Sequence, residues 1–155
     1  MKTRHWLMKS EPDVYSIDDL SRDGHTTWEG VRNFTARNFM RDAMLVGDLV
    51  LYYHSNAEPS GIAGVARVHK LAYADATQFD KKSEYYDPTA KKDDPRWVMV
   101  EVAFVEKFAT FVSLEALKKD KALKQMLVVQ KGQRLSVQPV EKKHFDRVMA
   151  LAQRK

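Results

Sequence analysis

One segment, residues 97–108, constrains the fold more than any other, because its hydropathy alternates with the two-residue period of a β-strand. The apolar side chains at 98, 100, 102 and 104 are expected to face one side of a sheet, and residues 99, 101 and 103 the other. Residues 62–74 alternate in a similar way, and Gly61 and Gly64 at the start of this stretch favour a bulge or a close approach of two backbones. The chain is therefore predicted to be organised around a sheet that contains these two strands.

Shorter segments add strands and helices around this pair. Further strands are predicted at His5–Met8, Leu49–His54 and Leu135–Val137. Helix starts are predicted at Ser16, Thr35, Ser113, Asp120 and Pro139. The buried helical residues are expected to be Ile17, Leu20, Phe39, Met40, Met44, Phe145, Val148, Met149 and Ala152. Strands mixed with short helices, without a βαβ rhythm, favour an α+β fold class built on a curled antiparallel sheet, in a single domain of residues 1–155.

Residue content narrows the function classes. Cysteine is absent, so disulfides, thiolate metal sites and cysteine nucleophiles are excluded. No two of the five histidines have the spacing of a helical metal-binding pair, so neither a metal nor another cofactor is expected. No apolar run is long enough for a membrane span or a secretory signal, which favours the bacterial cytoplasm or a eukaryotic cell interior. The net charge of +5 favours a polyanionic partner only slightly.

Catalytic sequence patterns are not found. There is no glycine-flanked serine elbow and no glycine-rich phosphate loop that ends in lysine and serine. A general base, if there is one, would have to come from Lys9, Glu11, Glu29 or Asp48, and each has a simpler role in a turn or an ion pair. We therefore expect a binding protein, with no catalytic residue.

Aromatic and small polar residues in the predicted loops suggest what is bound. Trp28 is expected in a loop between two helical segments, close in sequence to the amide of Asn33. Ser10 follows the first strand, and Tyr53-His54 end another. A flat ring surface with a few fixed polar groups is what recognition of a single nucleobase requires. Core packing is the simpler interpretation of the other tryptophans, and above all of Trp6.

At these same residues the sequence resembles the EVE domain family. The resemblance runs in order along almost the whole chain, through the segments 6–12, 28–34, 36–38, 47–48, 53–55, 61–64, 87–88, 95–97 and 133–139. It implies a PUA-like β-barrel flanked by short helices, related to domains that read methylated adenine or modified cytosine. It also implies a non-enzymatic nucleic-acid-binding protein that holds one modified base of DNA or RNA.

The resemblance assigns roles to particular side chains. Trp28 would form the aromatic wall of the pocket, and Ser10 and Asn33 would hydrogen-bond the edge of the base. The strand end at Tyr53, His54 and Ser55 would line the pocket. Lys9, Arg32 and Arg134 would contact phosphate or brace the loop, and Ser136 and Gln138 would lie at the pocket rim. Nucleic acid is the expected partner, with no membrane association, and the chain is expected to be a monomer.

Two other functions stay open at this point. A small hydrolase acting on a modified nucleobase or nucleotide, similar to the ASCH proteins, would share the PUA-like fold. A scaffold that meets an acidic protein through its lysine-rich helices would use the surface near residues 118–124 and 142–143. Tighter binding of a modified oligonucleotide than of its unmodified twin favours the reader. Turnover of modified nucleosides that is lost in Glu29→Gln favours the hydrolase, and failure to bind any oligonucleotide together with co-purification with a protein favours the scaffold.

Overall fold

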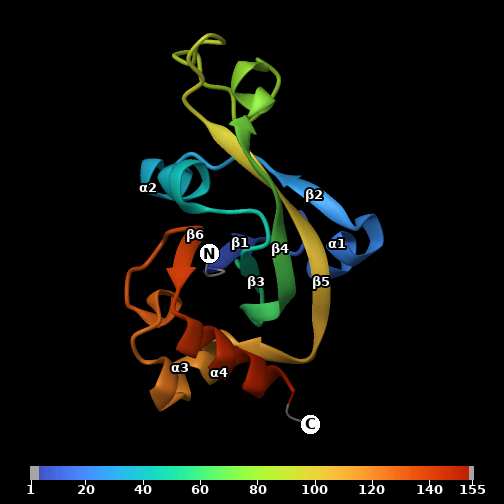
Figure 1. Cartoon of the computed structure of the whole chain (residues 1–155), viewed down its shortest axis with the longest axis vertical. Coiled ribbons are helices and arrows are strands. Elements are labelled where there is room, and N and C mark those ends of the chain that lie inside the picture. The colour runs from blue at the N-terminus through green and yellow to red at the C-terminus, as the bar shows by residue number, and fades with distance from the viewer. Residues whose placement is uncertain (1–3, 154–155) are drawn as a thin grey trace.

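The computed structural model describes residues 4–153 (Figure 1). Positions 1–3 and 154–155, which the expected domain of residues 1–155 includes, lie outside the described residues. The strands are β1 His5–Ser10, β2 His25–Trp28, β3 Leu49–His54, β4 Gly61–Ala74, β5 Val98–Ser113 and β6 Val137–Val140. The α-helices are α1 Ile17–Asp23, α2 Phe34–Asn38, α3 Leu114–Lys119 and α4 Lys142–Ala152. A π-helical turn (η1, Phe39–Ala43) and 3₁₀ turns η2 Ala76–Phe79, η3 Lys121–Leu123 and η4 Leu127–Val129 complete the order.

Within the described residues the strands form one six-stranded sheet in the order β2-β5-β4-β3-β1-β6. Figure 1 shows β4 and β5 as long, twisted neighbours that run along much of the molecule, with α3 and α4 together at one end. The α+β class and the curled sheet with short flanking helices are confirmed. The expectation of a wholly antiparallel barrel is corrected, because β1 and β3 pair in parallel and β2 and β6 remain unpaired edges. A parallel pair needs a long crossover, which α1, β2 and α2 provide here.

The β4–β5 pair contains several register shifts, and they start at the glycines. A Cβ atom on Gly64 would collide with the carbonyl oxygen of Glu106 and would lie 2.9 Å from the side chain of Ile17. One on Gly61 would collide with the carbonyl oxygen of Val112. The close backbone approach expected at these glycines is therefore confirmed, and at Gly64 it also leaves room for the side chain of Ile17 in α1.

Both faces of the sheet are buried at its centre, and a separate hydrophobic core packs against each face. Trp6 and Tyr52 lie in the core that also contains Ile17 and Leu20 of α1. Leu7 and Tyr53, their sequence neighbours, lie in a second core with Phe145 and Val148 of α4. Neighbouring side chains on a strand point to opposite faces, so an apolar run such as Leu49–Tyr53 feeds both cores.

Several predicted ends of elements differ from the structure. Ser16 caps α1 and Ser113 caps α3, as expected. The cap of α2 is Asn33 and not Thr35, because the Asn33 Oδ1 atom accepts from the Ala36 N–H at 3.0 Å. Pro139 does not begin the last helix. It lies in β6, where an edge strand tolerates a residue without an N–H, and the helix begins at Lys142.

Strand β2 was not anticipated from the sequence. Its four residues form the edge next to β5, with Trp28 opposite Val100. Trp28 therefore ends a strand and does not lie in a loop, whereas residues 29–33 do form the connection to α2. None of the helices in the described part of the chain is long and apolar enough to cross a membrane.

Candidate functional site

A cavity of about 790 Å³ lies between the two open edges of the sheet. Thr26, Thr27 and Trp28 of edge strand β2 line it, and Ser136 directly precedes the other edge strand, β6. Small-ligand sites commonly enclose about 300–1,000 Å³. The remaining lining residues are Lys9, Ser10, Glu11, Val14, Tyr15, Glu29, Gly30, Val31, Arg32, Ser55, Glu84 and Tyr85.

The lining combines flat rings with many short polar groups. The rings belong to Tyr15, Trp28 and Tyr85, and the hydroxyl groups to Ser10, Thr26, Thr27, Ser55 and Ser136. Only Val14 and Val31 contribute branched aliphatic side chains. This composition suits a flat heterocycle with a hydrogen-bonding edge better than it suits a lipid or another wholly apolar ligand.

Trp28 forms part of the inner wall of the cavity. Its side chain is mostly buried, with 8% exposed, and its ring packs edge-on against Tyr52 at a centroid distance of 5.5 Å. The indole is thus anchored in the core and presents only a small part of its surface to the cavity. Packing of this kind holds a ring rigidly, which lowers the entropy lost when a ligand binds.

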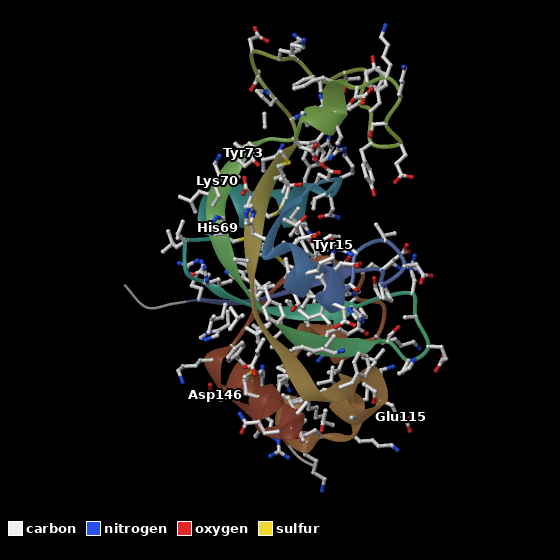
Figure 2. The ribbon with its side chains drawn as sticks, turned by 90° about the vertical axis from the view of Figure 1, so that its right-hand side faces the viewer. Tyr15, His69, Lys70, Tyr73, Glu115 and Asp146 are labelled. Atoms are coloured by element: carbon white, nitrogen blue, oxygen red, sulfur yellow. The ribbon has the colours of Figure 1, made fainter. Side chains whose placement is uncertain are left out.

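Ser10 lies at the end of β1 with its hydroxyl proton already committed. It donates to the carbonyl oxygen of Tyr15 at 2.8 Å, and the Tyr52 hydroxyl donates to the same oxygen at 2.7 Å. The Ser10 Oγ atom therefore has only lone pairs to offer a ligand. Tyr15, which Figure 2 shows beside α1, is itself held by a 2.7 Å hydrogen bond from its hydroxyl to Asp23.

Arg32 braces the loop of residues 29–33. All five N–H groups of its guanidinium donate hydrogen bonds to partners within the protein. The guanidinium donates to the carbonyl oxygens of Val31 and Tyr85, to the Thr77 hydroxyl and to the Asp75 carboxylate, at 2.8–3.1 Å. An arginine with no donor left cannot add a contact with phosphate without losing one of these. Of the two roles that the family resemblance allows, the structure thus favours bracing.

Asp75 is the fully buried partner at the centre of this brace. It accepts from the Gly30 N–H at 2.8 Å and from both the N–H and the hydroxyl of Thr77. Burial alone raises the pKa of this carboxyl, but hydrogen bonds from Thr77, Gly30 and Arg32 outweigh burial, and the pKa of Asp75 is lowered. The ionised carboxylate holds residues 30–32 against the segment that follows β4.

Tyr85 covers one side of the cavity and was not anticipated as a site residue. It belongs to the long connection between β4 and β5, which contributes none of the site residues expected from the sequence. Gly30 has a φ of +83°, and a Cβ atom there would lie 2.6 Å from the Tyr85 ring, so glycine allows the ring to pack over this loop. The signal in the sequence was the pair Tyr85-Tyr86 within a run of polar residues.

Lys9 belongs to the lining of the cavity, but its charged end lies beside Tyr53. Its ammonium group lies 5.7 Å from the centre of the Tyr53 ring, and burial lowers the pKa of this lysine. It lines the cavity beside Ser10, near Ser55 and Ser136. Since neighbouring residues of a strand point to opposite faces, this ammonium group lies toward the face of Tyr53, whereas the Ser10 hydroxyl lies toward Tyr15 and Tyr52.

Five of the expected site residues lie outside the lining of the cavity. Asn33 caps α2, and Tyr53 is buried in the second core because it points to the opposite face from Tyr52. Gln138 is buried and donates to the carbonyl oxygen of Leu135 at 2.9 Å. The other two are His54, which is half-buried, and Arg134, which is exposed.

The carboxylates considered as general bases also have identifiable roles. Asp48 is buried and accepts from the N–H groups of Arg4 and Leu45 and from the Trp6 indole at 2.9–3.1 Å. Glu11 accepts from the Asn56 amide at 2.5 Å. Glu11 and Glu29 are exposed and line the cavity. Asp48 is thereby assigned to the structure of its turn, and it is not among the residues that line the cavity.

His54 supports α1 and should make stability depend on pH. Its Nε2 atom accepts from the Ile17 N–H at 3.1 Å, and burial lowers the pKa of the ring from its ordinary value of 6.5. As pH falls below 6.5, the unfolded chain takes up a proton that the folded chain resists, so stability is lost. We expect this loss, at most about 1.4 kcal/mol per pH unit, to be smaller in His54→Gln, measured by urea unfolding between pH 7.5 and 5.

The same comparison contains its own control. Burial also lowers the pKa of His5, but that residue is present in both proteins, and glutamine can still accept from the Ile17 N–H. An identical pH dependence in the two proteins would show that His54 is not the group responsible.

Comparison with known proteins places the chain in a family. The family model for the EVE domain matches residues 4–151. Human thymocyte nuclear protein 1 is 43% identical, and the match covers 97% of this chain and 74% of that protein. The chain belongs to the EVE domain family. Its expected PUA-like fold is thereby shown, with the qualification that the sheet of this EVE domain is mixed and open.

Several solved structures have a similar fold. A Pseudomonas syringae protein has a TM-score of 0.92 at 44% identity, with coverage of 96% of this chain and 99% of its own. Human THYN1, in a crystal structure with DNA that contains 5-methylcytosine, has a TM-score of 0.91 at 42% identity, with coverage of 99% of both chains. An ASCH protein from Zymomonas mobilis, at 7% identity and a TM-score of 0.55, shares the fold alone.

Proposed function

We propose that this EVE protein is a non-enzymatic reader of nucleic acid that binds a single modified base in the cavity between the two sheet edges. The first candidate for this base is 5-methylcytosine in DNA. The observation that carries the proposal is the joint lining of that cavity by Trp28, Tyr85 and Ser10. A similar protein, human THYN1, has been crystallised with DNA that contains 5-methylcytosine. The proposal also includes a monomeric protein that acts where the cell keeps its nucleic acid, in the nucleus or the cytoplasm.

Different lining residues would contact different parts of the nucleotide. The ring of Tyr85 and the exposed part of Trp28 offer stacking surface, and Val14 and Val31 offer packing for a methyl group. Ser10 can only accept a hydrogen bond, so it suits an exocyclic amine such as that of cytosine or adenine. Lys9 would face a phosphate, a role that Arg134 could share only from the exposed rim.

Magnitudes limit how the modification is recognised. Burial of one methyl group contributes about 0.8 kcal/mol, or roughly a fourfold preference. Stacking contributes about 1–3 kcal/mol per base, but does so for every base. Larger selectivity must come from shape and from polar groups that the wrong base leaves unpaired. Since extraction of a base from a duplex costs a few kcal/mol, single strands or distorted sites should bind best.

The test compares two neighbouring tyrosines. Tyr85 lines the cavity, whereas Tyr86 is 36% exposed and does not. We expect Tyr85→Ala to weaken binding of a single-stranded oligonucleotide with one 5-methylcytosine by roughly 5- to 150-fold, because a stacking surface is lost. Tyr86→Ala should bind like the unaltered protein. Fluorescence anisotropy measures both, with the unmodified oligonucleotide as reference.

The outcome can contradict the proposal in two ways. Equal affinity for the modified and unmodified oligonucleotides, repeated across the common base modifications, would refute a modified-base reader. Equal effects of the two tyrosine substitutions would remove the cavity from the binding site. The hydrogen bonds from Arg32 to residue 85 go to the backbone carbonyl oxygen, so Tyr85→Ala leaves them in place and removes only the contact between the guanidinium and the ring.

A further inference from the structure

The face of the sheet opposite Trp28 carries a second cluster of functional side chains. His25 lies on β2, Glu101 on β5 and His69 on β4, which are three adjacent strands. One ligand atom from each of the three lies within 4.8 Å of the others. No spacing pattern in the sequence indicates this cluster, because its three residues lie on three different strands and the two histidines are 44 positions apart.

Strand pairing explains why the three side chains meet. His25 is opposite Ala103, and Thr27 is opposite Glu101, so His25 and Glu101 share a face that alternates with Trp28 and Val100. The β4–β5 register shifts between Val68 and Lys70, which makes His69 the extra residue of a bulge opposite Glu101. A bulge can redirect a side chain. Figure 2 shows His69 next to Lys70 and Tyr73 along β4, on the other side of that view from Tyr15.

We propose that His25, His69 and Glu101 bind one divalent first-row transition-metal ion, such as Zn²⁺ or Cu²⁺, on this outer face of the sheet. Two imidazoles and one carboxylate are ligands that Zn²⁺ uses when a fourth position is open to water. Cu²⁺ should bind more tightly than Zn²⁺ to such a site. This inference is independent of the proposed base-binding function.

The carboxylate is already positioned for a ligand role. The Tyr73 hydroxyl donates to Oε2 of Glu101 at 2.6 Å, and the other oxygen, Oε1, lies 3.8 Å from Nδ1 of His25. Outer contacts that orient a metal ligand in this way commonly strengthen binding.

The histidines are free to converge on an ion. Their rings stack with centroids 5.1 Å apart, and among the described residues neither imidazole makes a hydrogen bond. Ligand atoms on a tetrahedral zinc lie about 3.3 Å apart, so small side-chain rotations are needed. The side chain of His25 is 58% exposed, which leaves it room to rotate. Lys70, 4.0 Å from Glu101, opposes a cation but is itself exposed and can turn away.

Calorimetric titration of the tag-free full chain with ZnCl₂ tests the site. We expect one ion per chain, and an affinity at least roughly tenfold weaker in His69→Gln and in Glu101→Gln. The matched control is Glu106→Gln, another carboxylate of β5 that is exposed and outside the cluster, which should bind like the unaltered protein. Circular dichroism without metal confirms that the variants fold.

Paramagnetic resonance with Cu²⁺ identifies the ligands. We expect hyperfine splitting from two nitrogen atoms, reduced to one in His25→Gln. Failure to bind either ion, or unchanged binding in the double variant His25→Gln/His69→Gln, would overturn the proposal. Oligonucleotide affinity should stay the same in all of these variants, so failure of the metal site and failure of the base-binding site remain distinguishable.

Discussion

Replacement of Asp75 by alanine is expected to lower the free energy of unfolding by about 3–5 kcal/mol, the usual effect of breaking a buried ion pair from one side. The carboxylate is fully buried and accepts from Gly30, Arg32 and Thr77. Its removal leaves the Arg32 charge and two backbone N–H groups without their partner. Because total stabilities are commonly about 5–15 kcal/mol, this loss should be visible in thermal and urea unfolding.

The matched control for this substitution is Asp93→Ala. Asp93 is an exposed carboxylate in the same long connection between β4 and β5. Surface substitutions of this kind usually change stability by less than about 0.5 kcal/mol. If Asp75→Ala were no more harmful than Asp93→Ala, the brace between residues 30–32 and 75–77 would not contribute to stability as the structure indicates.

Replacement of Trp28 by alanine should remove both stability and base binding. The indole belongs to the first core and packs on Tyr52, so truncation is expected to cost about 3–5 kcal/mol. It also deletes the rigid inner wall of the cavity, so the difference in affinity between modified and unmodified oligonucleotides should disappear. Urea unfolding measures the first effect, and anisotropy at low temperature, where the variant is folded, measures the second.

A second core residue separates these two effects. Met40 is buried in the same core, with 1% exposed, but does not line the cavity. Met40→Ala should therefore destabilise the protein by about 2–5 kcal/mol and still distinguish the two oligonucleotides when folded. Equal loss of discrimination in both variants would mean that instability, and not the wall of the cavity, explains the result for Trp28.

The position of the cavity follows from the way the sheet ends. A closed barrel would pair β2 with β6 and fill the space between them with hydrogen-bonded backbone. Here the two edges stay apart, and the gap is lined by β2 and by residues that flank β1, β3 and β6. The Asp75–Arg32 brace and the Tyr85 ring hold the loop after β2 in place on one side. Because β2 and β6 do not pair with each other, the space between these two edges can hold a ligand.

Local patterns in the sequence determined much of the fold. Alternating apolar residues predicted β4 and β5, and the hydroxyl of Ser16 predicted the start of α1, because both depend on neighbours in the chain. The motif around Trp28 pointed to the right part of the chain for the cavity. Ser10, Ser55, Ser136, Lys9 and Arg32 were also placed in its lining.

Tertiary structure alone decided which of these groups line the cavity. Asn33 and Tyr53 are close in sequence to residues that line the cavity. The Asn33 side chain caps α2, however, and the Tyr53 side chain packs in the second core on the opposite face of β3. Tyr85 reaches the cavity from a distant connection, and His25, His69 and Glu101 meet through strand pairing and a bulge. Side-chain spacing along a chain reveals local structure, whereas a site depends on which distant segments the sheet brings together and which polar groups are already paired.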